Sequence, residues 1–144
     1  MLVGGPGNDQ LFGGAGNDSY RFGPGDGMDY VRDLGLPADF DRLLLDVPFG
    51  PERIWLKSVG HDLHVMLLGS ADLVVLAGVQ GPEQTDIEQN RIELIELANG
   101  RRLSVTAADA LVQVMASMPM QAEERSAEQN EQLASALEQA WVQP

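Results

Sequence analysis

Cysteine is absent from this 144-residue chain, which excludes both a disulfide framework and a thiolate metal site. Positive charge is scarce as well: 9 Lys and Arg stand against 22 Asp and Glu, and the formal net charge is −13. Nucleic acid is therefore a poor partner, because a phosphate backbone requires basic contacts. An acidic surface of this kind favours cations instead.

Long apolar stretches are also missing. No segment reaches the roughly 18 apolar residues of a membrane span, so we expect no transmembrane segment. Residues 1–6 contain neither a basic region nor an apolar region, and we expect no N-terminal secretion signal in this chain. Its length fits one folded unit with a tail.

The acidic residues divide by type along the chain. Residues 1–46 contain eight aspartates and no glutamate, whereas residues 119–144 contain five glutamates and no aspartate. Aspartate suits turns and glutamate suits helices, which explains part of this division. Short carboxylates beside glycine also supply the oxygen ligands that a hard cation such as calcium prefers. The N-terminal part is therefore the better place for a metal site.

A nine-residue repeat occupies this part of the chain. Gly4–Phe12 is followed directly by Gly13–Arg21, and a third copy, Pro24–Arg32, follows the inserted pair Phe22-Gly23. Leu2 fits the end of a preceding copy. Each copy combines a six-residue glycine turn with a three-residue strand, because glycine permits the tight backbone path. The middle residue of each strand should be buried: Leu11, Tyr20 and Val31.

The repeat resembles the RTX, or haemolysin-type, calcium-binding nonapeptide. The alternative, a glycine-rich linker with Asn-Asp turns, is disfavoured by the tandem copies. The resemblance implies a parallel β-roll, in which calcium lies between turns stacked on the same edge. The first turn then stacks on the third, and Asp9 and Asp29 supply carboxylates to calcium. Nearby carbonyl oxygens complete the ligands, those of Gly5, Gly7, Gly25 and Gly27.

The second turn belongs to the opposite edge by the same resemblance. There Asp18, with Gly14 and Gly16, needs partners from an upstream repeat or from the connector that follows the repeats. The connector candidates are Asp33, Asp39 and Asp41. Three further turn residues complete the predicted metal-site set: Asn8, Asn17 and Asp26.

The rest of the chain resembles the module that commonly follows RTX repeats. The resemblance rests on the motifs Phe22–Asp29, Gly60–Leu63 and Ile92–Gly100. Apolar runs predict strands at 43–45, 53–59, 63–68 and 73–77, the last three covered on both faces. Asn99-Gly100 predicts a hairpin between 92–98 and 103–105. A helix should follow, with Thr106 as its N-cap and Pro119 after its end at Met118.

The tail has a composition dominated by Gln, Glu, Ala and Ser. Ser126 begins a second capping pattern, after which four residues share one helical face: Leu133, Leu137, Ala140 and Trp141. The tail is either an amphipathic helix, free or packed on the preceding module, or a disordered segment that folds on binding. By its resemblance to RTX tails it is also a candidate type I secretion signal.

The expected fold is mainly β, with one or two C-terminal helices. A β-roll stub of repeats (1–35) is continued by a β-rich capping module (36–118) and the acidic tail (119–144). No nucleophile-base pattern is present, so we expect no enzyme. His61 and His64 lie in a turn and on a strand, and they are interpreted as ordinary turn and strand residues.

The resemblance also implies a function and partners. The chain is expected to be the C-terminal, calcium-triggered folding and type I secretion module of a larger RTX protein, a toxin, adhesin or exoenzyme. Its partners would be calcium ions, the exporter, upstream repeats and a cargo domain, outside a Gram-negative cell or on its surface. Two alternatives stay open: an adhesive or receptor-binding module, and the non-catalytic part of a secreted protease or epimerase.

Overall fold

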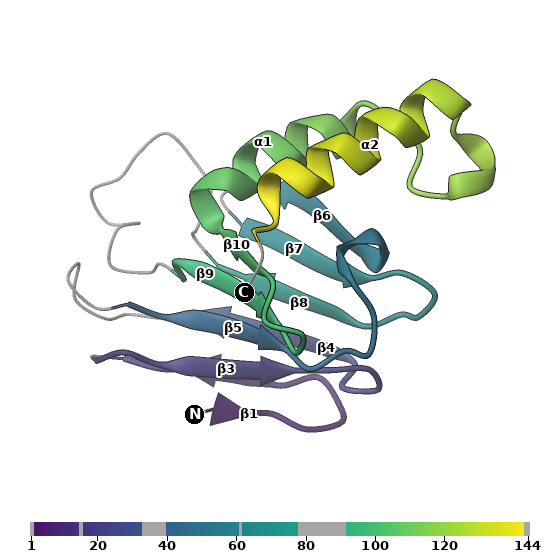
Figure 1. Cartoon of the computed structure of the whole chain (residues 1–144). Helices are drawn as coiled ribbons and strands as arrows, with labels where there is room; N and C mark the ends of the chain where they lie inside the picture. The colour runs from purple at the N-terminus through teal and green to yellow at the C-terminus, as the bar shows by residue number, and fades with distance from the viewer. Residues whose placement is uncertain (1, 15, 33–39, 61, 78–91, 143–144) are drawn as a thin grey trace.

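The computed structural model describes the chain except residues 1, 15, 33–39, 61, 78–91 and 143–144. Two five-stranded sheets face each other, and two helices cover one end of the pair (Figure 1). Sheet A has the strand order β1-β3-β5-β9-β10, and sheet B has the order β2-β4-β8-β7-β6. The fold is therefore mainly β with C-terminal helices, as predicted. Among the described residues, no helix is long and apolar enough to cross a membrane.

The first five strands alternate between the two sheets and pair in parallel. They are β1 (Leu2–Val3), β2 (Gln10–Phe12), β3 (Ser19–Phe22), β4 (Met28–Arg32) and β5 (Arg42–Leu45). Leu11 lies opposite Val31 in sheet B, and Tyr20 lies opposite Leu43 in sheet A. Alternation follows from the nine-residue period, because each glycine turn delivers the next short strand to the other sheet. Tyr20, Val31 and Leu43 are buried, whereas Leu11 at the N-terminal end is only partly buried.

The capping strands extend both sheets. They are β6 (Ile54–Val59), β7 (Asp62–Leu67), β8 (Leu73–Leu76), β9 (Leu94–Leu97) and β10 (Arg102–Ser104), with a short 3-10 helix η1 (Pro51–Arg53) before β6. β6, β7 and β8 form an antiparallel series, and β8 joins β4 in parallel. β9 joins β5 in parallel and pairs with β10 through the predicted Asn99-Gly100 hairpin. Each predicted strand is confirmed within one or two residues at its ends.

Burial on both faces is confirmed for part of this region only. The first half of β6 and most of β8 are buried, but β7 alternates between buried and half-buried residues. The second half of β6 is exposed. The prediction of full cover fails there; in the covered half, the Leu56 amide lies 3.2 Å from the Met115 sulfur.

Helix α1 (Val105–Ala116) begins earlier than predicted. Its N-cap is Ser104, whose side-chain oxygen accepts a hydrogen bond from the Ala107 amide at 3.0 Å. Ser104 is the last residue of β10 and still has extended backbone, which is the conformation that an N-cap requires. Thr106 already lies inside the helix, so its prediction as the cap was wrong. The helix also ends at Ala116 rather than at Met118.

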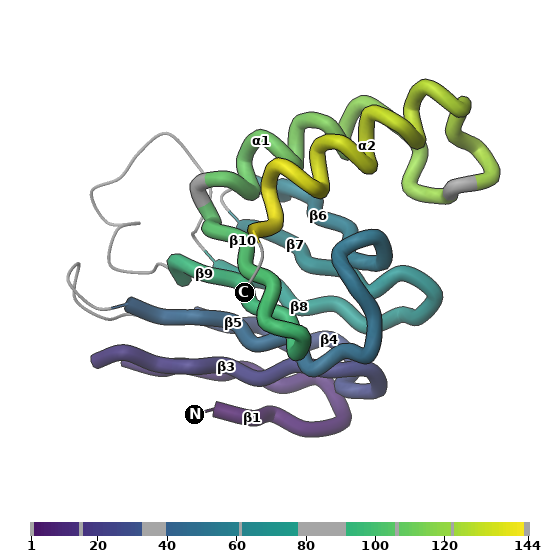
Figure 2. Tube along the Cα trace, viewed as in Figure 1, coloured from purple at the N-terminus to yellow at the C-terminus, as the bar shows by residue number. Residues whose placement is uncertain are grey.

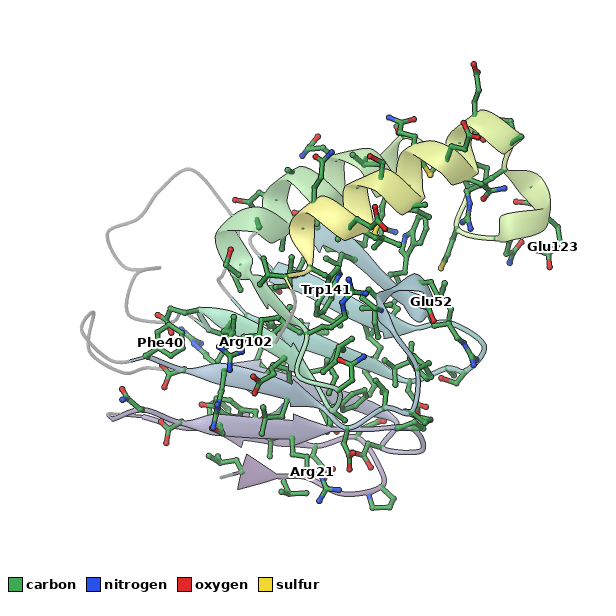
Figure 3. All side chains as sticks on the ribbon, in the orientation of Figure 1. Arg21, Phe40, Glu52, Arg102, Glu123 and Trp141 are labelled. Atoms are coloured by element: carbon green, nitrogen blue, oxygen red, sulfur yellow. The ribbon has the colours of Figure 1, made fainter. Side chains whose placement is uncertain are left out.

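The tail forms helix α2 (Ala127–Ala140), preceded by a 3-10 turn η3 (Ala122–Glu124). The capping box predicted from Ser126 and Gln129 is present, with both of its hydrogen bonds. α2 lies beside α1 at the end of the sheets opposite to β1 (Figure 2). Trp141 follows the last turn of α2 and is 1% exposed between the helices and the sheets (Figure 3). Of the alternatives for the tail, the structure shows the amphipathic helix packed on the cap.

A single apolar cluster connects these parts. It runs from Tyr20 in the repeats through both sheets to Leu133 and Trp141 in the tail. After Trp141 the chain forms an antiparallel bridge between Val142 and Arg102 at the edge of sheet A. The repeats, the cap and the tail therefore share one core.

Candidate metal centre

The three repeat turns share the same pair of glycine conformations. We name them turn 1 (Gly4–Asp9), turn 2 (Gly13–Asp18) and turn 3 (Pro24–Asp29). In each turn, the glycines at the second and fourth positions have positive φ, a backbone conformation that residues with a Cβ rarely adopt. These pairs are Gly5 (76°) and Gly7 (111°), Gly14 (78°) and Gly16 (94°), and Gly25 (90°) and Gly27 (81°). The turn geometry therefore follows the repeat position by position.

The inserted pair Phe22-Gly23 is accommodated at the end of β3, before turn 3. Phe22 lengthens β3 and is 1% exposed in the core. Gly23 then closes a local turn with Asp26, whose carboxylate accepts the Gly23 amide at 2.9 Å. Asp26 is thus used inside its own turn, and the positive-φ pair of turn 3 is preserved.

Turn 1 stacks on turn 3 and brings Asp9 and Asp29 together. The Asp9 amide donates to Asp29 Oδ1 at 3.1 Å. The second oxygens of both carboxylates, Asp9 Oδ2 and Asp29 Oδ2, are buried and have no hydrogen-bond partner within the described chain. Buried carboxylate oxygens are normally hydrogen-bonded or metal-bound, because desolvation without a partner is costly. Two such oxygens at neighbouring turns fit a hard cation.

Burial also acts on the charge of Asp29. The side chain is 1% exposed, and this burial is the main cause that raises the pKa of Asp29, with the Asp9 charge adding to it. A folded-state pKa above the unfolded value means that ionised Asp29 disfavours folding. The penalty is complete at pH above the folded pKa and disappears below the unfolded pKa. At neutral pH a bound cation would offset it.

Backbone carbonyls must complete this centre. Within the described ranges, no group of three or more His, Cys, Asp or Glu side chains is arranged to hold a metal ion. The Gly7 carbonyl points at turn 3, since a Cβ added at Gly27 would lie 2.7 Å from Gly7 O. The Gly27 carbonyl instead accepts the Leu73 amide at 2.9 Å, which turns it toward β8. The structure therefore offers Gly7, and not Gly27, as a carbonyl ligand between the two turns.

A second ladder of acids lies on the opposite edge. The Asp18 amide donates to Asp41 Oδ1 at 2.7 Å, and the Asp41 amide donates to Glu93 Oε2 at 2.7 Å. Asp18 Oδ2 is buried without a hydrogen-bond partner in the described chain. The structure therefore brings Asp41 to Asp18, while Asp33 and Asp39 lie outside the described residues.

Glu93 is the member of this ladder that the sequence patterns missed. Its signal is the spacing of the repeat itself, an acid two residues before a buried strand residue. Asp18 precedes Tyr20 by two, and Glu93 precedes Ile95 by two in the same way. The glycines that would have drawn attention to this position are absent.

The N-terminal part matches a known repeat family. Residues 1–28 match the family model of the RTX calcium-binding nonapeptide repeat (4 copies). Residues 1–28 are RTX repeats. RTX nonapeptide repeats bind calcium, so calcium is the cation expected between their turns. The match ends one residue before Asp29, whose place opposite Asp9 comes from the parallel register of β2 and β4. No curated protein matches the chain.

The two asparagines of the RTX repeats join stacked turns. Asn8 Oδ1 accepts the Met28 amide at 3.1 Å, and Asn17 Oδ1 accepts the Phe40 amide at 2.7 Å. The first bond connects equivalent positions of turns 1 and 3, and the second connects turn 2 to the residue before Asp41. Asn8 and Asn17 therefore hold the stack in register, and their Oδ1 atoms are engaged with backbone rather than directed at a cation.

Contact between turns 1 and 3 can be tested at Gly27. Gly27→Ala places a Cβ at 2.7 Å from Gly7 O, a distance that such atoms essentially never show, and adds positive-φ strain of about 1–2 kcal/mol. Gly60→Ala is the matched control, because its φ is +62° but nothing lies within 4 Å of the new Cβ. We expect calorimetry to show calcium affinity at least about tenfold weaker for Gly27→Ala only, by analogy with outer-shell changes at metal sites. Equal affinities would contradict the stacking.

Proposed function

We propose that the chain is a non-enzymatic, calcium-triggered folding module at the C-terminal end of a larger secreted RTX protein. The observation that carries this proposal is the pair of buried carboxylate oxygens, Asp9 Oδ2 and Asp29 Oδ2, without hydrogen-bond partners between stacked RTX turns. Such a pair is unfavourable without a cation and favourable with one. Calcium binding would therefore be coupled to folding of the repeats.

Mass action makes this coupling a switch. At submicromolar cytosolic calcium the carboxylates repel one another and the repeats stay open, whereas millimolar extracellular calcium fills the site. A ligand present at 100 times its Kd stabilises the folded state by about 2.7 kcal/mol. Several sites along a stack of repeats would multiply this effect, because repeat units gain stability from their neighbours.

The N-terminal end of the sheets supports the proposal of upstream repeats. β1 and β2 are the edge strands at this end, and their inward residues Leu2 and Leu11 are only partly buried. Their outward residues Val3 and Phe12 are 54% and 53% exposed. A preceding repeat on each edge would pair with the strands and cover Leu2 and Leu11.

We also propose export by type I secretion through the tail. RTX repeats are typical of secreted proteins of Gram-negative bacteria, and the absence of cysteine suits a chain that folds after export. The test is secretion of a passenger fused to residues 1–144, compared with a fusion that lacks residues 120–144. Since the exporter would carry an unfolded chain, loss of α2 should abolish secretion for lack of the signal. Equal secretion of both fusions would refute this role.

The folding proposal is tested by calcium titration. Both tryptophans, Trp55 and Trp141, lie in the cap and tail, while both tyrosines, Tyr20 and Tyr30, lie in the repeats. We expect far-UV circular dichroism to show strand formation as calcium reaches the millimolar range, with tyrosine signals changing more than tryptophan signals. Magnesium is the control, because it dehydrates reluctantly and prefers fewer protein ligands. Secondary structure that is indifferent to millimolar calcium would overturn the proposal.

A further inference from the structure

Turn 3 is the last repeat turn before sheet B continues into the cap. One side of turn 3 stacks on turn 1, and the other side faces the cap strand β8. β8 pairs in parallel with β4, with Met28 opposite Leu73 and Asp29 opposite Val74. A further repeat would place its aspartate at the position that Val74 occupies. Val74 is 0% exposed and apolar, so the residue opposite Asp29 on this side carries no carboxylate. The stack of aspartates formed by Asp9 and Asp29 therefore ends at the cap.

The cap does supply a carboxylate, two residues earlier. Asp72 lies directly before β8, and its two oxygens accept two different amides of turn 3. Gly25 N donates to Asp72 Oδ2 at 2.9 Å, and Gly27 N donates to Asp72 Oδ1 at 3.0 Å. These donors are the two positive-φ glycines that define the turn, and Asp72 is only 8% exposed. The Asp72 carboxylate thus binds backbone amides of turn 3 rather than a side chain.

Asp72 is itself held in place by the β7–β8 turn. Its amide donates to the Ser70 side-chain oxygen at 3.2 Å, and its carbonyl accepts the Leu67 amide at 3.2 Å. The hydrogen bond from the Gly25 amide is the first cause that lowers the pKa of Asp72, and the one from Gly27 adds to it, against the opposing effect of burial. The side chain is therefore an ionised acceptor at neutral pH, and charge-assisted hydrogen bonds of this kind are the strong ones.

We propose that Asp72 is a positioning residue for the calcium centre between turns 1 and 3. Both hydrogen bonds of its carboxylate to the repeats go to turn 3. It holds Gly25 and Gly27 in the conformation that lets turn 3 present Asp29 to Asp9 and to the Gly7 carbonyl. At this last turn, where Val74 stands in place of the aspartate of a further repeat, the cap carboxylate takes the place of a neighbouring turn. The inference rests on the proposed calcium-dependent folding of the repeats.

A positioning role and a purely structural role predict different results. If the repeats are open without calcium, the bonds from Asp72 to turn 3 form only in the calcium-bound state. Asp72→Asn should then weaken calcium binding and leave the calcium-free stability of the cap unchanged. If Asp72 instead stabilises the cap itself, its replacement should lower stability without calcium.

The experiment compares Asp72→Asn with Ser70→Ala and Asp72→Glu in the full chain. Asn retains one acceptor but presents an N–H group to the second glycine amide. We expect a calcium midpoint raised about 10–100-fold, the range for outer-shell partners of metal ligands. Ser70→Ala removes a hydroxyl that accepts the Asp72 amide and also hydrogen-bonds the Asp72 carboxylate, but it keeps both bonds from the glycine amides, and its midpoint should stay within about threefold of the parent. Asp72→Glu restores the charge and should recover part of the affinity.

The calcium-free urea midpoint, followed by tryptophan fluorescence, decides between the two roles. An unchanged calcium titration for Asp72→Asn would overturn the inference. So would a calcium-free midpoint that falls, or a variant that is unfolded with and without calcium, because either result makes Asp72 a structural part of the cap. A parent chain whose circular dichroism and fluorescence do not change with calcium would instead refute the proposed function.

Discussion

Replacing Asp29 by Asn should weaken calcium binding at least about 100-fold and, at the same time, lower the free-energy cost of closing the repeats without calcium. The loss exceeds the roughly 10–100-fold cost of outer-shell changes because a proposed ligand charge is removed. The gain follows from burial: ionised Asp29 disfavours folding, as its raised pKa indicates, and Asn carries no charge to desolvate. The Asn side-chain oxygen can still accept the Asp9 amide. Calorimetry measures the affinity, and far-UV circular dichroism in a chelator measures how much strand the calcium-free repeats form.

Asp26→Asn is the matched control for this prediction. It removes the same charge from the same turn, but Asp26 accepts the Gly23 amide just before that turn, a bond that Asn can also make. We expect its calcium affinity to change by less than about threefold, because Asp26 acts on Asp29 through its charge alone and less strongly than Asp9 does. If both variants lost affinity equally, the carboxylates would act through general charge and not through a defined centre.

Trp141→Ala should lower the free energy of unfolding by about 3–5 kcal/mol, the usual range for removing a buried tryptophan. Trp141 is 1% exposed and belongs to the core cluster with Leu133, so its loss opens a cavity where the tail joins the sheets. The change should appear both with and without calcium, since Trp141 lies beside the helices, away from the repeat turns (Figure 3). Urea unfolding followed by circular dichroism measures it.

Val142→Ala provides the control, because Val142 is 55% exposed and its backbone bridge to Arg102 is independent of the side chain. Its stability should remain within about 0.5 kcal/mol of the parent. A parent-like stability for Trp141→Ala would show that the tail does not contribute to the core in solution. The tail would then be free to act as a signal alone.

The Trp141 and Val142 variants address two proposed roles of the tail, packing in the core and acting as an export signal. A secretion signal is used while the chain is unfolded, whereas the contacts of Leu133 and Trp141 exist only after folding. The two roles are therefore compatible in time. Removal of residues 120–144 should destabilise the folded cap as well as affect export, so its secretion is compared with that of Trp141→Ala, which should lose stability and keep the signal.

Patterns of neighbouring residues were sufficient to predict most of the strands and helices. Apolar runs predicted β5 to β8, Asn99-Gly100 predicted the β9–β10 hairpin, and the Ser126 capping box predicted α2. These features depend on residues close in sequence. The N-cap of α1 was misplaced because two hydroxyl residues, Ser104 and Thr106, compete there, and the choice depends on where β10 ends.

The resemblance to RTX repeats allowed part of the metal centre to be predicted, because it implies which turns stack. Asp9 and Asp29 are brought together as the resemblance implied, and Asp18 meets Asp41, one of three connector candidates. The cap contributions were not predictable in this way. Glu93 and Asp72 reach the turns through pairing with β5 and β4, over 52 and 47 residues of sequence.

By itself, then, the sequence determined the repeat conformation and the kind of cation it suits, because glycines with positive φ and aspartates at a fixed period are local properties. Only the tertiary structure decided how the repeats end. Parallel pairing of β8 with β4 puts Val74 opposite Asp29 and Asp72 on the turn amides. The burial of the tail was decided in the same way, because an amphipathic helix is specified by its own residues, but its partner surface is specified by the fold.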